Sequence, residues 1–280
     1  MKGYLDHVVL VACVCGASGC ATEEKASGAP DRLRVAGVVL KWRAGDRAAN
    51  YENAERLIRE AAGHGARIVC TAESFLDGYS IRDTSLSMAR FRALAEPVPG
   101  GEYCSKLQRL ADELDIHLIA AISEREGEKV YNSAILIGPD GEVLGRYRKR
   151  YLWGDERSKY AAGTSFPAFA TPYGKIGMMI CSDRRQAAAM KELVANGADL
   201  VFCPAGGGFG QDNDRVVAER SKEGKVPIVF VHPVKFLVTG RDGAVLTSEL
   251  FGDSLDYEEG RAVPGAVHYY DLALPLRARH

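Results

Sequence analysis

A cysteine marks the point where an apolar stretch of the chain becomes polar. Residues 175–185 have the sequence Lys-Ile-Gly-Met-Met-Ile-Cys-Ser-Asp-Arg-Arg, and the uncharged run at 176–180 predicts a strand buried on both faces. The composition of residues 186–196 predicts a helix. A thiol between a buried strand and a helix N-terminus lies where unpaired N–H groups and the helix dipole stabilise a thiolate. Cys181 is therefore a candidate nucleophile, with a packed structural thiol as the alternative.

Two further segments supply groups that such a nucleophile needs. Residues 68–79 form an apolar run that ends near Glu73, and residues 145–152 are a basic segment that contains Lys149. A carboxylate at a strand end can accept the thiol proton, pass it to a leaving amine and later activate water. A lysine close by supplies fixed positive charge for an oxyanion and favours the thiolate, with the backbone N–H after Cys181 as a second donor. For Glu73 and Lys149 alone, a surface salt bridge would be the ordinary interpretation.

The three segments together resemble the nitrilase, or carbon–nitrogen hydrolase, superfamily. Its members carry a Glu in a Pro-Glu-(x)n-Gly-Tyr context, a Lys in Tyr-Arg-Lys-x-His-Leu and a Cys in Gly-(x)3-Cys-x-Asp-x-Arg, in the order found here across residues 33–271. The resemblance implies an α/β fold, a four-layer αββα sandwich of two mixed β-sheets flanked by helices. It also implies a homodimer formed through helices beside the nucleophile, and a role for Glu156 in orienting Lys149 and the substrate. The alternative for Glu156 is one charge in a solvated run.

These residues predict a hydrolase that cleaves an amide or ureido group of a small molecule through a thioester on Cys181. No cofactor is expected. A nitrilase that uses the same residues on a C≡N bond is the rival enzyme. A protein of another class, an envelope-anchored binding protein without catalysis, would not need all four of Glu73, Lys149, Glu156 and Cys181. Ammonia release from amide, carbamoyl and nitrile panels distinguishes the three.

The run Cys-Ser-Asp-Arg-Arg resembles the N-carbamoyl-D-amino-acid hydrolase branch, where a neighbouring arginine binds the substrate carboxylate. We therefore expect Ser182 and Arg185 to contact substrate. The alternative for Arg185 is a residue that pairs with Asp183 or with solvent. Gln-Ala-Ala at residues 186–188 and His232 depart from the patterns common among amidases.

Charge and cysteine spacing narrow the possible partners. A formal net charge of −1 gives no electrostatic basis for binding nucleic acid. The seven cysteines show no paired metal-ligand spacing, so a zinc site at Cys181, Cys203 and His232 is disfavoured. His232, at the end of an apolar run, is instead expected to be packed or to line a pocket.

The first residues differ from the rest of the chain. Lys2, a short apolar region and small residues before Cys20 are typical of a bacterial lipoprotein signal. We expect residues 1–19 to be a signal peptide, residues 20–32 a polar linker and residues 33–280 the hydrolase domain. Lipid on Cys20 would hold the protein at the cell envelope. A misassigned start or a cytosolic tail is the alternative, which would leave the enzyme in the cytoplasm.

Apolar periodicity places the elements that position these residues. The sequence predicts strands at 34–40, 67–71, 117–123, 133–137, 143–149, 169–171, 175–180, 199–203, 228–232, 236–239, 244–246 and 267–271. It predicts helices at 50–63, capped by Asn50, and at 103–115, 186–196 and 212–224. Strands interspersed with helices imply sheets covered by helices.

Overall fold

The computed structural model describes residues 31–251 and 265–276. The expected lipoprotein signal and Cys20 lie outside these residues, so their assignment stays a prediction. Within the described part of the chain, no helix is long and apolar enough to cross a membrane.

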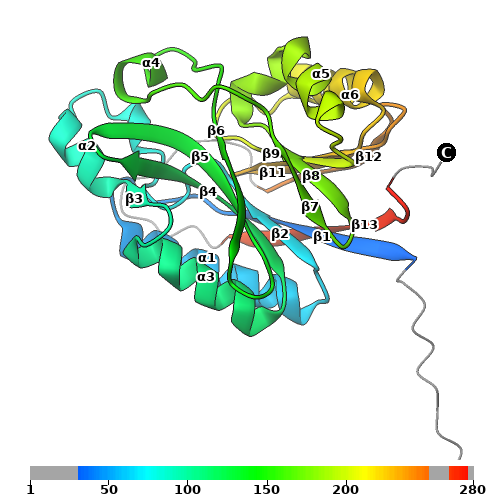
Figure 1. The fold of residues 1–280 in the computed structure, drawn as a ribbon, viewed down its shortest axis with the longest axis horizontal. Coiled ribbons are helices and arrows are strands. Elements are labelled where there is room, and N and C mark those ends of the chain that lie inside the picture. Colours follow the sequence, from blue (N-terminus) through cyan, green and yellow to red (C-terminus); the bar gives the residue numbers. More distant parts are fainter. Residues whose placement is uncertain (1–30, 252–264, 277–280) are drawn as a thin grey trace, which may run out of the picture.

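Two β-sheets face each other at the centre of the molecule (Figure 1). The seven-stranded sheet has the order β13-β1-β2-β4-β5-β6, with β3 paired to β4, and the six-stranded sheet has the order β12-β11-β10-β9-β8-β7. Both sheets mix parallel and antiparallel pairs. The strands of the first sheet are β1 (Arg32–Val39), β2 (Ile68–Thr71), β3 (Glu96–Pro97), β4 (His117–Glu126), β5 (Lys129–Ile137), β6 (Val143–Arg148) and β13 (Ala266–Ala273). Those of the second are β7 (Ala168–Thr171), β8 (Gly174–Met178), β9 (Leu200–Pro204), β10 (Ile228–His232), β11 (Lys235–Thr239) and β12 (Val245–Leu250).

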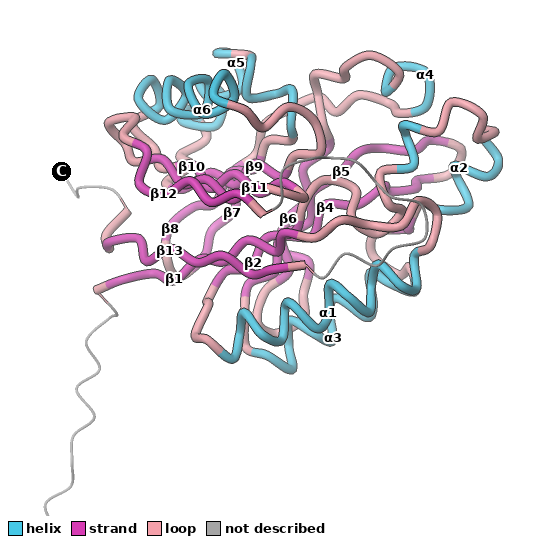
Figure 2. Tube along the Cα trace, turned by 180° about the vertical axis from the view of Figure 1, so that it is seen from behind, coloured by secondary structure: helices cyan, strands magenta, loops and turns pink. Residues whose placement is uncertain are grey.

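Helices cover the outer faces of both sheets, which completes the four layers that the sequence predicted (Figure 2). Helices α1 (Arg47–Gly63) and α3 (Glu102–Leu114) lie on the first sheet, and α5 (Ala187–Ala195) and α6 (Gln211–Gly224) lie on the second. Two shorter helices, α2 (Met88–Leu94) and α4 (Glu156–Lys159), belong to connections between strands.

Side-chain alternation along β1 shows how the layers share the core. Leu33 and Val35 face the second sheet, whereas Ala36 and Val38 face the helical layer. Period-two alternation with both faces apolar is expected for a strand buried on both sides. Gly37 stands between the sheets, where a Cβ atom would lie 2.4 Å from Phe236 Cδ2.

Three local features differ from the sequence prediction. Asp46, not Asn50, caps α1, because its carboxylate accepts from the Ala49 N–H. Asn50 lies inside the helix, buried, and its amide bonds to the backbone of Arg43. Helices α2 and α4 were not predicted, because segments of seven and four residues carry too little apolar periodicity.

Candidate active site

Three strand ends bring the predicted groups together. Glu73 follows the last residue of β2 by two positions, Lys149 directly follows β6, and Cys181 follows β8 by three. The first two strands belong to one sheet and β8 belongs to the other. The candidate site therefore forms where ends of strands from the two facing sheets converge.

The site contains a buried cation between two carboxylates. The Lys149 ammonium donates to Glu73 Oε1 at 2.8 Å and to Glu156 Oε1 at 2.6 Å. The side chains of Lys149, Glu73 and Glu156 are 1%, 0% and 5% exposed. Burial would lower the pKa of Lys149, but the charges of Glu73, Cys181 and Glu156 outweigh it and hold that pKa above its ordinary value. Lys149 is thus a fixed cation inside the protein.

Glu73 has one oxygen that is held and one that is available. Its Oε1 accepts from Lys149 and, at 2.8 Å, from Asn132 Nδ2. Its Oε2 is buried and has no hydrogen-bond partner among the described residues. Glu156 is fixed on both sides, since its Oε2 accepts from the Trp153 N–H at 2.8 Å. An anchored carboxylate with one unoccupied oxygen is suited to accept a proton.

Cys181 stands on a strained turn that presents its thiol. Its φ of +47° is left-handed, a conformation that costs a non-glycine residue about 1–3 kcal/mol. Asp183 holds the turn, because Oδ2 accepts from the Ile180 N–H at 2.9 Å and from the Tyr147 hydroxyl at 2.6 Å. Oδ1 accepts from the Tyr151 N–H at 2.9 Å. The segments that carry Cys181 and Lys149 are thereby tied to each other.

Two expectations about the thiol need correction. A five-residue 3-10 turn, Cys181–Arg185, follows the strand, and the predicted helix begins only at Ala187, so its N-terminus does not lie at Cys181. Burial, followed by the charge of Glu73, raises the pKa of the Cys181 thiol, against the opposing effects of Lys149 and Arg184. These effects favour a neutral thiol at Cys181, which would need a base in order to act as a nucleophile.

The paired arginines lie in different environments. Arg184 is 2% exposed, and its Nη1 donates to Cys181 Sγ at 3.6 Å. Its other hydrogen bonds are to Asn213 Oδ1 at 2.6 Å and to the Gly208 carbonyl at 2.8 Å; within the described chain it forms no ion pair with a carboxylate. Arg185 lies at the rim, where its half-exposed side chain pairs with Asp212 at 3.3 Å. Ser182 donates its hydroxyl to the Tyr151 carbonyl at 2.6 Å and so secures the neighbouring loop.

A cavity of about 680 Å³ opens over these groups. Lys149, Glu156, Cys181 and Arg184 line it, as do Ser182, Arg185, Tyr79 and the glycines at 206–208. A Cβ atom on Gly206 would lie 2.7 Å from the Tyr79 ring, and one on Gly207 would lie 3.4 Å from Cys181 Sγ. A side chain at Gly206 would therefore clash with Tyr79, whereas a Cβ atom at Gly207 would be in ordinary contact with the Cys181 thiol.

The histidine and cysteine considered as zinc ligands are packed groups. His232 is fully buried, and burial together with Arg184 lowers its pKa to about 3. Cys203 is also fully buried and free. Among residues 31–251 and 265–276, no group of three His, Cys, Asp or Glu side chains is arranged to hold a metal.

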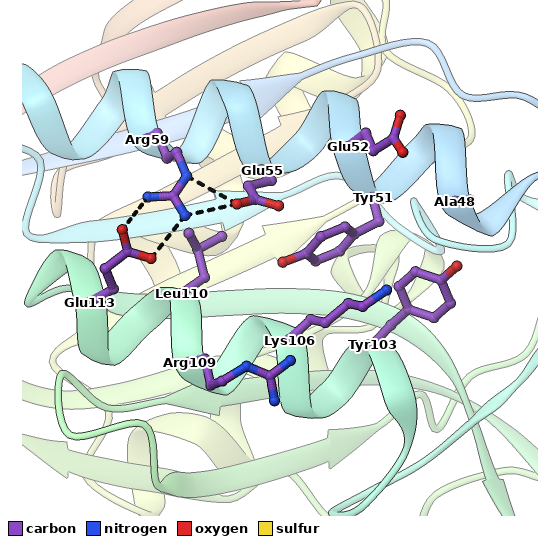
Figure 3. Close-up of a pocket in the computed structure, with 10 residues that line it drawn as sticks. All are labelled: Ala48, Tyr51, Glu52, Glu55, Arg59, Tyr103, Lys106, Arg109, Leu110 and Glu113. Atoms are coloured by element: carbon purple, nitrogen blue, oxygen red, sulfur yellow. Dashed lines mark hydrogen bonds and ion pairs between the residues drawn. The ribbon is translucent and has the colours of Figure 1, made fainter.

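A second groove lies on the outer helical layer, between α1 and α3 (Figure 3). Three acidic and three basic side chains line it, and Arg59 is fully engaged with Glu55 and Glu113. Lys106 lies over the rings of Tyr51 and Tyr103. No residue lines both this groove and the cavity over Cys181. Its balanced charges favour neither an anion nor a cation.

Sequence reasoning missed two residues of the site. Asn132 escaped notice because the predicted strand began after it, although the hairpin register places its carbonyl opposite the Lys149 N–H, at 2.8 Å. The sequence predicted substrate contact for Arg185 and not for Arg184. The local sequence does not indicate which of two adjacent arginines points inward. The position of Asn132 opposite Lys149 in the predicted hairpin, in contrast, could have identified Asn132 as a site residue.

Comparison with known proteins agrees with the resemblance. The model of the carbon–nitrogen hydrolase family matches residues 34–258. A nitrilase from Pyrococcus abyssi is 33% identical, over 56% of this chain and 58% of its own length. Omega-amidase NIT2 from Homo sapiens is 35% identical, over 55% and 57%. An N-carbamoylputrescine amidase from Oryza sativa is 32% identical, over 73% and 72%. The chain thus spans little more than half the length of the first two.

Solved structures share the fold at lower identity. Nit3 from Saccharomyces cerevisiae, a member of branch 10 of the nitrilase superfamily, has a TM-score of 0.73 at 21% identity, covering 88% of this chain and 92% of its own. An amidase from Nesterenkonia sp. has a TM-score of 0.72 at 20% identity, covering 90% and 95%. These similarities confirm the predicted αββα sandwich.

Proposed function

Because the chain belongs to the carbon–nitrogen hydrolase family, we propose that it hydrolyses a C–N bond, other than a peptide bond, in a small amide or N-carbamoyl compound. The proposal rests above all on Glu73, whose Oε1 is held by Lys149 and Asn132 while its buried Oε2 has no partner. That oxygen is available to a proton from Cys181 and then from water.

In the proposed reaction, Cys181 Sγ attacks the carbonyl carbon as its proton passes to Glu73. The carbonyl oxygen becomes an oxyanion, which Lys149 stabilises together with the backbone N–H of Ser182. Collapse of the tetrahedral intermediate breaks the C–N bond, and Glu73 returns the proton to the departing amine. Water then attacks the thioester with Glu73 as base, which releases the acid and restores the thiol.

The test is a panel of amide, N-carbamoyl and nitrile substrates assayed for ammonia release. We expect Cys181→Ala to lose turnover while remaining folded, because replacing the thiol by hydrogen leaves only a small cavity. Mass spectrometry of stalled turnovers should place the acyl adduct on Cys181. Normal turnover by Cys181→Ala would refute the mechanism, and absence of turnover across the panel would favour the binding protein.

A nitrilase is the second candidate, because relatives that share about a third of their aligned residues bear that name. The same thiol, base and cation could act on a C≡N carbon. Release of ammonia from nitriles, but not from the corresponding amides, would identify the protein as a nitrilase.

At the finer level of substrate class, we propose that Arg184 binds a substrate carboxylate, in place of Arg185. Arg184 is a buried cation without a carboxylate partner within the described chain, and its Nη1 lies 3.6 Å from Cys181 Sγ. A planar guanidinium suits bidentate recognition. N-carbamoyl amino acids should therefore outperform neutral analogues and N-carbamoylputrescine, whose amine would meet this cation.

The matched variants are Arg184→Lys and Arg185→Lys. Arg184→Lys should raise KM for carboxylate substrates and change KM for neutral amides little, whereas Arg185→Lys should affect neither class strongly. If Arg184→Lys lowered kcat/KM equally for carboxylate and neutral substrates, Arg184 would act on the thiol alone. If only Arg185→Lys raised KM for carboxylate substrates, Arg185 would be the carboxylate ligand instead.

We also propose a lipid anchor at Cys20 and a homodimer, which rest on the sequence pattern and the family resemblance. Several acyl chains hold a protein firmly to a membrane. Cys20→Ser should move the protein from the membrane fraction to the soluble fraction. Light scattering of the detergent-solubilised protein gives its oligomeric state, and a monomeric mass would end the dimer proposal.

A further inference from the structure

A second cavity adjoins the mouth of the active-site cavity. We call it the vestibule; it has a volume of about 370 Å³ and is lined by Arg150, Arg157, Tyr151, Leu152, Ala162 and Gln186, together with Trp153, Ser182 and Arg185. The last three residues also line the cavity over Cys181. A ligand lying past Ser182 and Arg185 would therefore occupy both spaces.

The charge of the vestibule has one sign. Of the residues that the structure describes, three arginines line it and no acidic side chain does. Arg150 and Arg185 each have a carboxylate partner outside the lining, Glu192 at 2.8 Å and Asp212 at 3.3 Å. Arg157 donates Nε to the Leu152 carbonyl at 3.3 Å and, among the described residues, has no ion pair. Walls of one sign attract a ligand of the opposite sign.

Trp153 stands at the junction of the two cavities. Its side chain is 69% exposed, the highest value among the exposed large hydrophobic residues of the described chain. Its backbone is nevertheless fixed, because its N–H donates to Glu156 Oε2 within the catalytic cluster. An indole that is fixed in place but exposed offers a flat apolar surface, and exposed aromatic residues of this kind are common at binding sites.

On these grounds we propose that the vestibule is a subsite for the distal, anionic end of an elongated substrate, whose middle part lies on Trp153. The proposal rests on the proposed C–N hydrolase function. It adds a length requirement, because a small amide fits within the cavity over Cys181 alone, whereas a carboxylate farther from the scissile bond would extend past Arg184 and reach Arg157.

The experiment uses ω-amido acids of increasing length, from succinamate to suberamate, each paired with the neutral amide of equal carbon number. We expect kcat/KM for the acid to exceed that of its neutral partner increasingly at the long end of the series. Arg157→Met should lower the suberamate-to-succinamate ratio of kcat/KM about tenfold, through KM, as expected for one charge-assisted hydrogen bond. Arg56→Met, on the exposed face of α1, is the matched control and should leave the ratio unchanged.

Two results would overturn the subsite: no preference for the long acid over octanamide, or an equal effect of Arg157→Met on short and long substrates. Failure of the proposed function is separable, because it would appear as no turnover of any amide. In that case, calorimetric titration of suberamate into Cys181→Ala and into Cys181→Ala/Arg157→Met decides. Weaker binding by the double variant supports the subsite, and equal or undetectable binding by both refutes it.

Discussion

At the scale of single residues, the charges around Cys181 explain how a buried thiol could lose its proton and act as a nucleophile. Two carboxylates, Glu73 and Glu156, and two cations, Lys149 and Arg184, act on it from the surrounding walls. Burial favours the neutral thiol, so the proton leaves only when a base is in place and the developing charge is stabilised. Deprotonation and attack on the substrate are therefore expected to occur together.

Removing the central cation tests this account. Lys149→Ala should lower kcat by about 10²–10³, the effect of losing a preorganised oxyanion donor. It also leaves Glu73 and Glu156 side by side without the charge that separates them. Steady-state kinetics of the purified, folded variant provides the measurement, and a rate within threefold of the parent would exclude Lys149 from the reaction.

Asn132 is a positioning residue, because it acts through Glu73. Its Nδ2 donates to Glu73 Oε1 at 2.8 Å and to Glu156 Oε1 at 3.4 Å. Asn132→Leu keeps the volume and removes both donors, so we expect kcat to fall about tenfold or more with little change in KM. Asn53→Leu, at a partly exposed site on α1, is the control. Loss of stability without loss of kcat would assign Asn132 a structural role alone.

At the scale of elements, a buried polar chain ties the segment after β2 to its neighbours. Ser123 of β4 donates to Asp77 Oδ2 and bonds the Tyr160 hydroxyl at 2.7 Å; that hydroxyl lies 3.5 Å from Ser74 Oγ. Burial raises the pKa of Asp77 from 3.8 to about 6. Ser74 is the residue after Glu73, so this chain supports the loop that carries the proposed base.

The raised pKa of Asp77 predicts how the free energy of unfolding changes with pH. The native state keeps the Asp77 proton up to about pH 6, whereas the unfolded chain releases it near pH 4. The contribution of Asp77 is therefore full below pH 4 and is lost as pH rises through 6. Relative to the parent, Asp77→Asn should gain up to about 3 kcal/mol in free energy of unfolding between pH 4 and pH 7. Urea unfolding at several pH values measures it, and a pH-independent difference would contradict the assignment.

At the scale of the whole molecule, the close approach of the two sheets brings together the strand ends that carry the candidate site. Gly37 of β1 lies against Phe236 and Val231 of the opposite sheet, where a Cβ atom would stand 2.4 Å and 3.2 Å from their side chains. Interiors packed at this density respond to a single added methyl group.

Gly37→Ala should destabilise the fold by about 1–3 kcal/mol, through overpacking between the sheets. Gly63→Ala, at the end of α1 where nothing lies within 4 Å, is the control and should be neutral or slightly stabilising. Thermal unfolding compares the two. The pair Gly37→Ala/Phe236→Leu should recover part of the loss, and a Gly37→Ala variant as stable as the parent would show that the sheets adjust.

The sequence by itself predicted most of the strands, the main helices, and Glu73, Lys149 and Cys181 as the candidate catalytic groups. It could do so because these features are local. A strand buried on both faces is an uncharged apolar run, as at residues 176–180 before Cys181 and 68–72 before Glu73, whereas Lys149 was found through the basic motif at residues 145–152.

Only the tertiary structure decided which groups surround the thiol and in what state it rests. Arg184 and Arg185 are adjacent in sequence, yet one is buried against Cys181 and the other pairs with Asp212 at the rim, because the 3-10 turn directs them differently. The raised pKa of Cys181 follows from burial between two sheets. The contact of Asn132 with Glu73 joins residues 59 positions apart. Burial and long-range contacts depend on how whole layers pack, and no local pattern of residues encodes them.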